Sequence, residues 1–175
     1  MLISKVETQL GAMIAGSVDE GICMFEFSDR NTLEAEYNDL KNYCKQEIVE
    51  GENEHIKNLK LQIDEYFAGT RKIFDLPIVA PGTEFQKRVW AELMNIPYGV
   101  TRSYRQQADA LESPLSIRAV ANANGMNRIA IIIPCHRVIG SDGSLTGYGG
   151  GLHRKKWLLD HEKKHSGQPF STPLF

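Results

Sequence analysis

Residues 131–138 constrain this chain more than any other stretch of its sequence. They begin with three β-branched isoleucines, which indicate a buried, strand-like run that Pro134 then stops. Cys135 and His136 follow at once. Proline favours the first position of a helical turn, whose free backbone N–H groups would help to hold the cysteine as a thiolate. The stretch therefore predicts either a reactive Cys-His pair or a buried structural cysteine beside a hydrogen-bonded histidine.

Length and composition predict one domain of ordinary size, or a small domain attached to another. The chain has 175 residues, and its 42% hydrophobic content is enough to bury a core. It contains no run of about 18 apolar residues and no signal-peptide layout, so we expect a cytoplasmic protein without membrane contact. The widely spaced cysteines form no C-x-x-C motif, which argues against a disulfide framework or a zinc finger. They are Cys23, Cys44 and Cys135, and no pattern predicts a metal or another cofactor.

Charge is distributed unevenly along the chain. Residues 1–80 carry 8 Lys and Arg against 15 Asp and Glu, whereas residues 81–175 carry 12 against 7. This difference suggests that only the second half meets a polyanion, although a solvated basic face is the commoner cause of such a balance. The acidic side chains of the first half are interpreted as solvated surface. They include Glu34, Glu36, Glu50, Glu52 and Glu54.

The first part of the chain is predicted to form an antiparallel sheet with helices. Apolar segments at residues 3–8, 11–15 and 22–27 are separated by turn-like sequences, which favours a meander of short strands. Apolar positions at helical spacing predict helices over about 31–43 and 55–67. We interpret this part of the chain as a structural scaffold. The inward-facing residues of its second helix are expected to be Ile56, Leu59, Ile63, Tyr66 and Phe67.

A change of composition at residues 75–82, which contain two prolines and a glycine, predicts a linker. It would divide the chain into a first domain, residues 1–80, and a second domain, residues 81–175. Thr83 and Gln86 then form a capping box, because the threonine side chain can cap a helix and the glutamine can reach back to it. The second domain is therefore expected to open with a helix.

Two short helices, at about residues 104–111 and 115–124, have the pattern of a helix-turn-helix. Ser103 can cap the first, and Gly125 can end the second. The second helix carries small side chains apart from Arg118. Major-groove readers usually carry several long polar side chains, whereas small residues allow a close approach to the minor groove, where one arginine can enter the base stack. Arg118 is either such a finger or a surface residue on an alanine-rich helix.

A glycine-rich loop lies between the Cys-His pair and the last predicted helix. Six glycines occur in residues 140–151, and a backbone without side chains can approach a ligand closely. The loop is not a phosphate-binding P-loop, because the Lys-Ser/Thr ending is absent. The last helix is expected over about residues 152–165, and residues 166–175 are expected to be irregular.

Residues 134–138, Pro-Cys-His-Arg-Val, resemble the active-site motif of the O6-alkylguanine-DNA alkyltransferases, also called methylated-DNA–protein-cysteine methyltransferases. The resemblance is close over residues 83–162 and looser before them. It implies an α+β (α/β) fold in which a ribonuclease-H-like N-terminal domain, an antiparallel sheet with helices, precedes a mostly helical C-terminal domain with a helix-turn-helix. The other segments that carry the resemblance are Pro97-Tyr98-Gly99, Ser103-Tyr104, Arg118-Ala119-Val120, Asn127, Gly147-Tyr148-x-Gly150-Gly151-Leu152 and Lys155-x-Trp157-Leu158-Leu159-x-His161-Glu162.

The resemblance implies direct reversal of DNA damage, in which a methyl or larger alkyl group passes from O6 of guanine to Cys135. It leaves open whether O4 of alkylated thymine is a further substrate. Such a displacement needs a thiolate and a stabilised leaving group. By resemblance, His136 takes the thiol proton through a bridging water and Glu162 orients the imidazole. Tyr104 donates a proton to N3 of the departing guanine, and Asn127 braces the active-site turn. No cofactor is implied, and each molecule acts once.

The implied partner is double-stranded DNA that carries O6-alkylguanine, and the protein is expected to act as a monomer in a nucleoid or a nucleus. Because the reactive atom lies inside the duplex, the nucleotide must flip out, and Arg118 resembles the finger that fills its place. The further residues assigned to DNA are Ala119, Ala121, Ala123, Ser103 and Arg137. The residues assigned to the substrate pocket are Val138, Tyr148, Gly149, Gly150, Lys155 and Asn124.

Within that pocket, the resemblance implies that the carbonyls of Cys135 and Val138 accept from N2 of guanine and that the N–H of Gly149 faces O6. Several positions depart from the family's common pattern. Arg128 stands where proline is frequent, and Gly149 stands where some members have serine. Asn124 and Ala130 also replace residues that are often more apolar or proline. The size of the alkyl pocket therefore stays open.

Three other functions fit parts of the sequence. A non-catalytic alkyltransferase-like protein, which marks damaged DNA for other repair, would typically have tryptophan in place of Cys135. A helix-turn-helix transcription regulator would carry long polar side chains on its second helix. A cysteine hydrolase would leave Arg118 and the small-residue helix without a purpose.

Overall fold

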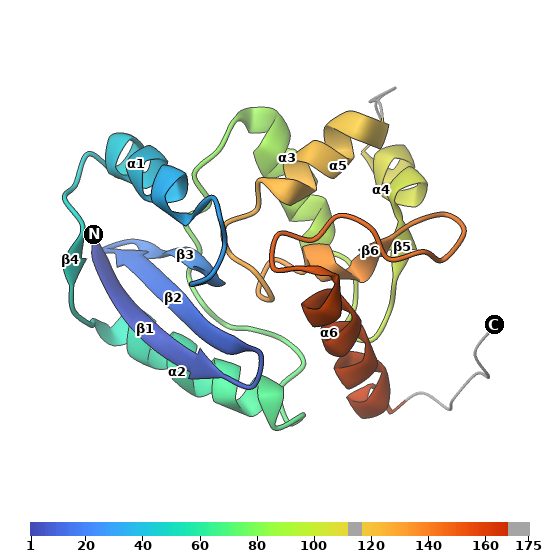
Figure 1. Cartoon of the computed structure of the whole chain (residues 1–175), viewed down its shortest axis with the longest axis horizontal. Coiled ribbons are helices and arrows are strands. Elements are labelled where there is room, and N and C mark those ends of the chain that lie inside the picture. Colours follow the sequence, from blue (N-terminus) through green and yellow to red (C-terminus); the bar gives the residue numbers. More distant parts are fainter. Residues whose placement is uncertain (112–116, 168–175) are drawn as a thin grey trace.

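The N-terminal part of the structure is a four-stranded sheet with one helix on each face (Figure 1). β1 (Leu2–Thr8), β2 (Gly11–Val18) and β3 (Gly21–Phe27) pair antiparallel in the spatial order β3-β2-β1. β4 (Val49–Glu50) extends the sheet by pairing parallel with β1. The predicted antiparallel meander is confirmed, although β2 continues to Val18, beyond its expected end.

Strand β3 is buried along its whole length, because α1 (Leu33–Cys44) covers one face of the sheet and α2 (Glu54–Phe67) covers the other. Its side chains alternate between the two faces. Met24 packs in a cluster with Leu40 of α1, whereas the next residue, Phe25, packs in the cluster to which α2 contributes. All five residues that were expected to face inward on α2 are buried.

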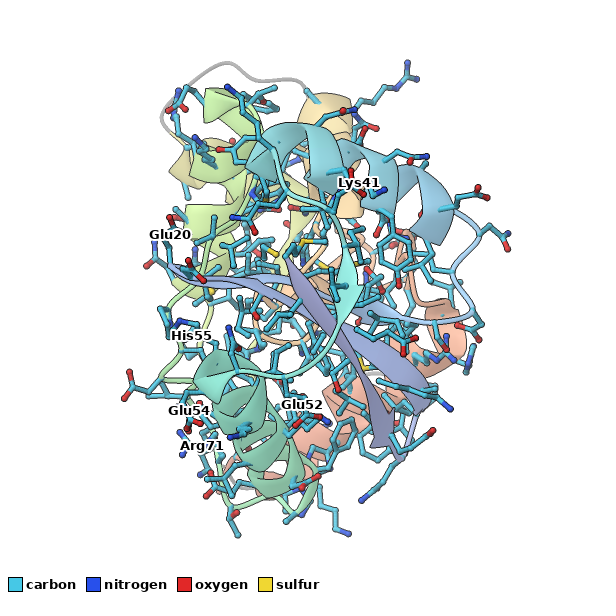
Figure 2. The ribbon with its side chains drawn as sticks, turned by 90° about the vertical axis from the view of Figure 1, so that its left-hand side faces the viewer. Glu20, Lys41, Glu52, Glu54, His55 and Arg71 are labelled. Carbon is cyan, nitrogen blue, oxygen red and sulfur yellow. The ribbon has the colours of Figure 1, made fainter. Side chains whose placement is uncertain are left out.

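The outer surface of this part is charged, as the face shown in Figure 2 illustrates with Glu20, Lys41, Glu52, Glu54, His55 and Arg71. The predicted acidic surface is confirmed for Glu34, Glu50, Glu52 and Glu54, which are exposed. The prediction is wrong for Glu36, which is buried and lies 3.1 Å from Nε of Arg30. Glu36 therefore belongs to an internal ion pair and not to the solvated face.

The second part of the chain is mostly helical. The structure, a computed structural model, describes residues 1–111 and 117–167. The predicted turn of the helix-turn-helix and the first residues of its second helix, 112–116, lie outside this range, as does most of the predicted irregular tail, 168–175. Within the described range, no helix has both the length and the apolar composition needed to cross a membrane. The helices of this part are α3 (Glu84–Met94), α4 (Tyr104–Ala110), α5 (Ile117–Gly125) and α6 (Leu152–His165).

Side-chain caps set the starts of α3 and α4. Thr83 Oγ1 accepts from the backbone N–H of Gln86 at 3.2 Å, and the Gln86 side chain accepts from the N–H of Thr83 at 2.9 Å. Ser103 and Gln106 form the same reciprocal box at the start of α4. Each box satisfies two N–H groups that a helix start leaves without a partner. Both predicted caps are confirmed.

A small parallel sheet, which the sequence did not predict, connects the helix-turn-helix to the Cys-His segment. β5 (Arg102–Ser103) pairs with β6 (Val138–Ile139), and β5 leads directly into α4. This pairing places the first turn of α4, and with it Tyr104, next to the end of the Cys-His segment.

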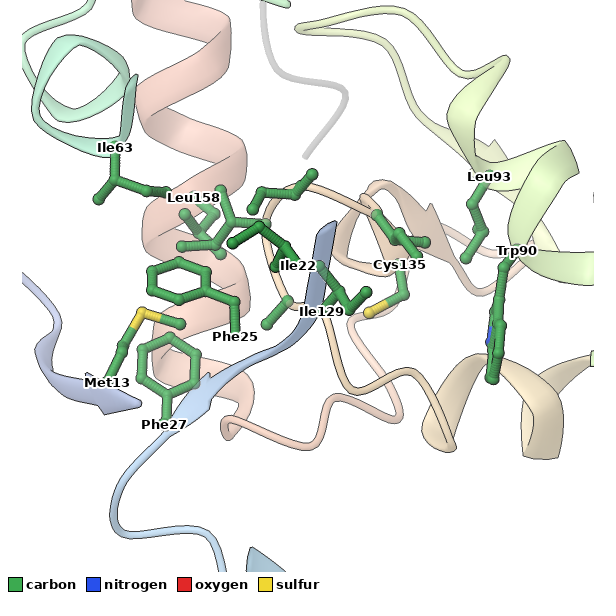
Figure 3. Packing of buried hydrophobic residues seen from close by; sticks show 14 of the residues in the cluster. Met13, Ile22, Phe25, Phe27, Ile63, Trp90, Leu93, Ile129, Cys135 and Leu158 are labelled. Carbon is green, nitrogen blue, oxygen red and sulfur yellow. The ribbon is translucent and has the colours of Figure 1, made fainter. Parts of the chain in front are cut away.

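One hydrophobic cluster draws side chains from both parts of the chain. Figure 3 shows Met13, Phe25 and Phe27 of the sheet beside Ile129 and Leu158, with Cys135, Trp90 and Leu93 further along the same cluster. The backbone also bridges the two parts, since the N–H of Phe25 donates to Arg128 at 2.8 Å and Phe25 accepts from Ala130 at 2.7 Å. The division at residue 80 stays a prediction.

The run of three isoleucines is buried as expected, but its predicted strand conformation is wrong. Residues 131–133 form tight turns: Ile132 N–H donates to Ala130 at 2.8 Å, and Cys135 N–H donates to Ile133 at 2.8 Å. Ile131 has φ +71°, an uncommon and strained value for a β-branched residue. A continuous apolar run signals burial and leaves the conformation undetermined. Cys135, two residues after these turns, is buried as well.

Candidate active site

Cys135 begins the short 3-10 helix η1 (Cys135–Arg137) and is 9% exposed. Asn127 Nδ2 lies 3.3 Å from the sulfur and also donates to the Ile133 carbonyl at 2.9 Å. Asn127 Oδ1 accepts from the N–H of Ile129 at 3.0 Å. One amide side chain therefore ties the turn before Cys135 to the thiol itself, which is the bracing position expected for Asn127.

The thiol of Cys135 is held in its protonated form. Burial raises its pKa to about 11, although the Asn127 hydrogen bond and the charges of Lys155 and Arg30 act in the opposite direction. The expected help from a helix start is small, because η1 has three residues and the N–H of Cys135 already donates to Ile133. A nucleophile in this position needs a base that removes its proton during the reaction.

His136, the residue after Cys135, is the candidate base. Its Nε2 lies 2.7 Å from Oε1 of Glu162, and both side chains are fully buried. Burial lowers the pKa of His136, so the imidazole is neutral and its Nε2–H donates to the carboxylate. Nδ1 then carries a free lone pair, and it has no hydrogen-bond partner within residues 1–111 and 117–167. This nitrogen can accept a proton.

Glu162 is bound by four residues from three parts of the chain. Besides His136, it accepts from Arg137 at 2.9 and 3.0 Å, from the Tyr66 hydroxyl at 2.8 Å and from the N–H of Gly99 at 3.0 Å. Burial alone would raise the pKa of Glu162, but the charges and hydrogen bonds of its partners hold it well below the usual range. The carboxylate stays ionised and fixes the orientation of the imidazole.

The predicted contact of Arg137 with DNA is wrong. Its guanidinium is buried, donates a hydrogen bond to each carboxylate oxygen of Glu162 and donates to the Ile96 carbonyl at 2.6 Å. It also lies 5.8 Å from the ring centre of Tyr98. The basic residue of the motif therefore neutralises the internal carboxylate, and a charge pair of this kind cannot be told from a surface arginine by sequence pattern.

Tyr104 and Lys155 lie together, with the Lys155 ammonium 5.7 Å from the centre of the Tyr104 ring. The Tyr104 hydroxyl donates to the carbonyls of Thr146 at 3.1 Å and Gly147 at 3.3 Å, and burial raises its pKa, so it stays protonated. Lys155 is fully buried, and its ammonium donates to Val138 at 2.5 Å and Thr146 at 2.7 Å. Burial lowers the pKa of Lys155 to about 8. The Val138 carbonyl, expected to bind guanine, already accepts one hydrogen bond.

A small pocket of about 10 Å³ adjoins the Cys135 sulfur and includes four of the six residues that were assigned to the substrate. The Tyr148 hydroxyl is buried there and has no partner in the described part of the chain. Asn124 exchanges two amide hydrogen bonds with Gln107, at 2.7 and 3.1 Å, which fixes its side chain. The lining consists of Glu26, Arg30, Asn124, Gly125, Asn127, Ala130, Cys135, Tyr148, Gly149 and Gly150.

Glu26 and Arg30 are the lining residues that the sequence interpretation missed. Glu26 is buried, and burial raises its pKa to about 7 although Arg30 pairs with it. The one available signal was a carboxylate between Phe25 and Phe27 in an otherwise apolar strand. Charged residues are almost never fully buried unless they are paired, so such a position marks an internal site.

The helix α5 presents part of the predicted DNA-binding face. Arg118 is exposed, and Ala119 and Ala121 are partly exposed. The prediction is wrong for Ala123, which is 2% exposed and whose carbonyl accepts from Trp90 Nε1 at 2.9 Å. Ala123 instead allows α5 to pack closely on α3. Ser103, also assigned to DNA, uses its hydroxyl to accept from Gln106 at the start of α4.

Known proteins resemble this chain over nearly its whole length. Residues 1–80 match the ribonuclease-like domain of 6-O-methylguanine DNA methyltransferase, and residues 84–164 match its DNA-binding domain. A methylated-DNA–protein-cysteine methyltransferase of Methanosarcina acetivorans is 41% identical over 93% of this chain and 98% of its own length. The constitutive protein of that name from Bacillus subtilis is 40% identical over 91% of this chain and 94% of its own.

A solved structure agrees with these matches. The crystal structure described as Mycobacterium tuberculosis OGT in complex with DNA has a TM-score of 0.82 and 36% sequence identity, covering 94% of each chain. Both sequence matches and the architecture therefore point to the same assignment. The chain belongs to the 6-O-methylguanine DNA methyltransferase family.

Proposed function

We propose that this protein repairs DNA by transferring a methyl group from O6 of guanine to Cys135, once per molecule. The observation that carries the proposal is a buried cysteine followed in sequence by a neutral histidine whose Nε2 is bound to an ionised, buried carboxylate. The names of the relatives and the DNA in a similar solved structure support the substrate class. The thioether product has no easy route back to a thiol, so the protein is consumed.

The reaction starts with proton removal from Cys135. A bridging water carries the thiol proton to Nδ1 of His136, and the imidazolium is stabilised by Glu162. The thiolate forms a bond to the methyl carbon while the bond from that carbon to O6 breaks. The guanine anion takes a proton at N3 from the Tyr104 hydroxyl, and solvent returns the imidazolium proton to the tyrosinate. Thiol and alkylguanine thus become thioether and guanine.

DNA would bind along α5. Arg118 is exposed on this helix beside partly exposed alanines, so the helix can enter a minor groove and the arginine can fill the space of a flipped nucleotide. A transcription regulator is disfavoured because the described part of α5 carries few long polar side chains. A non-catalytic role is disfavoured by the presence of Cys135. We expect the protein to act as a monomer in the compartment that holds the chromosome.

Methyl transfer can be read directly by mass spectrometry. After incubation with a duplex that contains O6-methylguanine, we expect one added methyl group on the peptide that carries Cys135. Cys23 and Cys44 serve as internal controls and should stay unmodified, because neither lines the pocket to which Cys135 contributes. The Cys135→Ser variant should still bind the duplex. Loss of the methylated base without a modified Cys135 would refute the mechanism.

The finger role of Arg118 predicts a difference between two substrates. In Arg118→Ala, repair of the methylated duplex should fall roughly 10- to 100-fold, because the unstacking cost of a few kcal/mol is less well offset. Transfer from the free base O6-methylguanine, which needs no flipping, should be unchanged. Arg105→Ala is the matched control, since Arg105 is an exposed arginine on the neighbouring helix α4. Equal losses on both substrates would exclude a finger.

A further inference from the structure

Arg30, in the turn between β3 and α1, connects the N-terminal sheet to the pocket beside Cys135. Its Nη2 donates to the carbonyl of Gly125 at 2.8 Å, and its Nη1 contacts the carbonyl of Asn127 at 3.4 Å. Its Nε lies 3.1 Å from Glu36, and Nη1 forms a second ion pair with Glu26. Two carboxylates and two carbonyls therefore hold one guanidinium.

The guanidinium also lies against the glycine-rich loop. A Cβ atom added to Gly149 would be 2.7 Å from Cζ and from Nη1 of Arg30, which is closer than atoms can approach. Gly149 thus permits the loop to rest on the arginine. Arg30 also lines the pocket together with Cys135, and its side chain is partly exposed to solvent.

The space left beside the sulfur is about 10 Å³. A cavity of roughly 10–15 Å³ on this measure holds one water-sized group, which is close to the size of a methyl group. Several other lining residues are small, including Gly125, Ala130 and Gly150. The restriction therefore comes from the large side chains, and Arg30 is a large one that is supplied by the first part of the chain.

We propose that Arg30 determines substrate specificity by closing the alkyl pocket, so that methyl groups are transferred to Cys135 and bulky alkyl groups are excluded. The inference rests on the proposed function and adds to it the class of alkyl group. A larger group such as benzyl can enter only if Arg30 leaves its partners. Its side chain is 11% exposed and bonded on several sides, so this displacement breaks buried charge-assisted bonds. The specificity would then come from a steric clash with bulky alkyl groups and not from a new contact with the methyl group.

The surroundings suit a test by substitution. Burial raises the pKa of Glu26 to about 7 even beside Arg30, so in Arg30→Ala this carboxyl can take up a proton. Glu36 keeps a hydrogen bond from Thr32 Oγ1 at 2.7 Å. Glu26 is therefore not left as an unpaired buried charge, and Glu36 retains a neutral hydrogen-bond donor. Arg128 offers a matched control, because it also joins the two parts, through Pro81 and Asp39, but does not line the pocket.

The experiment measures single-turnover alkylation of Cys135 by two free bases, O6-methylguanine and O6-benzylguanine. In Arg30→Ala the ratio of benzyl to methyl rate should rise about 10-fold or more, the size of discrimination that a small change in pocket volume produces. Arg30→Gln, a smaller change, should raise the ratio less, and Arg128→Ala should leave it unchanged.

Each outcome is decisive. An unchanged ratio in a folded Arg30→Ala protein that still transfers methyl would overturn the specificity role, as would equal losses of both reactions. If Arg30→Ala does not fold, an unchanged ratio in Arg30→Gln would overturn it instead. Failure of the proposed function looks different, because the wild-type protein would then not methylate Cys135 from either O6-methylguanine or a methylated duplex.

Discussion

Replacing Glu162 with glutamine is expected to slow methyl transfer about 10³- to 10⁴-fold and to lower the free energy of unfolding by about 3–5 kcal/mol. The amide cannot hold the neutral imidazole of His136 in one tautomer, because its own NH₂ group competes as a donor. It also leaves the buried guanidinium of Arg137 without a counter-charge. Single-turnover kinetics would measure the first effect and urea unfolding the second.

The two effects of Glu162→Gln can be separated. Adding Arg137→Met removes the unpaired charge, so the double variant should recover stability while methyl transfer stays slow. Asp29→Asn is a matched control, because Asp29 pairs with Arg154 through a largely exposed carboxylate and should change stability by less than about 1 kcal/mol. A loss of rate below roughly 10-fold in Glu162→Gln would show that His136 works without its carboxylate.

Acid should reduce the stability difference between wild type and Glu162→Gln. Folding lowers the pKa of Glu162, so its contribution to stability is complete above its unfolded value of about 4.3. That contribution is lost as the pH falls from there towards the folded pKa. The wild-type protein therefore loses more stability on acidification than the variant does at this position.

Replacing Lys155 with methionine is expected to slow methyl transfer roughly 10- to 100-fold at neutral pH, equivalent to about 1.4–2.8 kcal/mol. Burial raises the pKa of Cys135 to about 11, and the Lys155 ammonium is one of the charges that oppose this rise. Without it less thiolate forms at a given pH, so the rising limb of the pH–rate profile should move to higher pH. The profile can be recorded by single-turnover kinetics with a methylated duplex.

The wild-type advantage over Lys155→Met should shrink above about pH 8, where burial causes Lys155 itself to lose its proton. Lys156→Met is the control, since Lys156 is exposed on the same helix and pairs with Asp160 at 2.6 Å. Lys155 also supports the carbonyls of Val138 and Thr146. A slower rate with an unmoved pH profile would assign it this structural role alone.

Local rules predicted much of this fold. The capping boxes at Thr83 and Ser103 use bonds between residues three apart, and the inward face of α2 follows from its spacing. The turns at residues 131–133 could not be predicted in this way. Their conformation depends on Asn127 and on backbone bonds with Phe25, which lies more than a hundred residues away in sequence.

The same distinction between local pattern and tertiary contacts applies to the site residues. Cys135, His136 and Glu162 were named through a resemblance to a family, and the structure buries all three and pairs His136 with Glu162. Arg137 and Ala123 were misplaced because a motif does not say which way a side chain points. Glu26 and Arg30 were missed because pairing between buried charges is a tertiary property. Where a charge interrupts an apolar strand, however, its partner is worth seeking.

The bond from the Tyr66 hydroxyl to Glu162 has a consequence for the exchange of segments between relatives. A chimaera that takes its first 80 residues from another member of the family would keep the motif around Cys135 intact. It would nevertheless need a phenol at the end of α2 to reach the carboxylate behind His136. The choice of donor for a recombinant repair protein is thus constrained at one aromatic residue, far outside the motif by which the family is recognised.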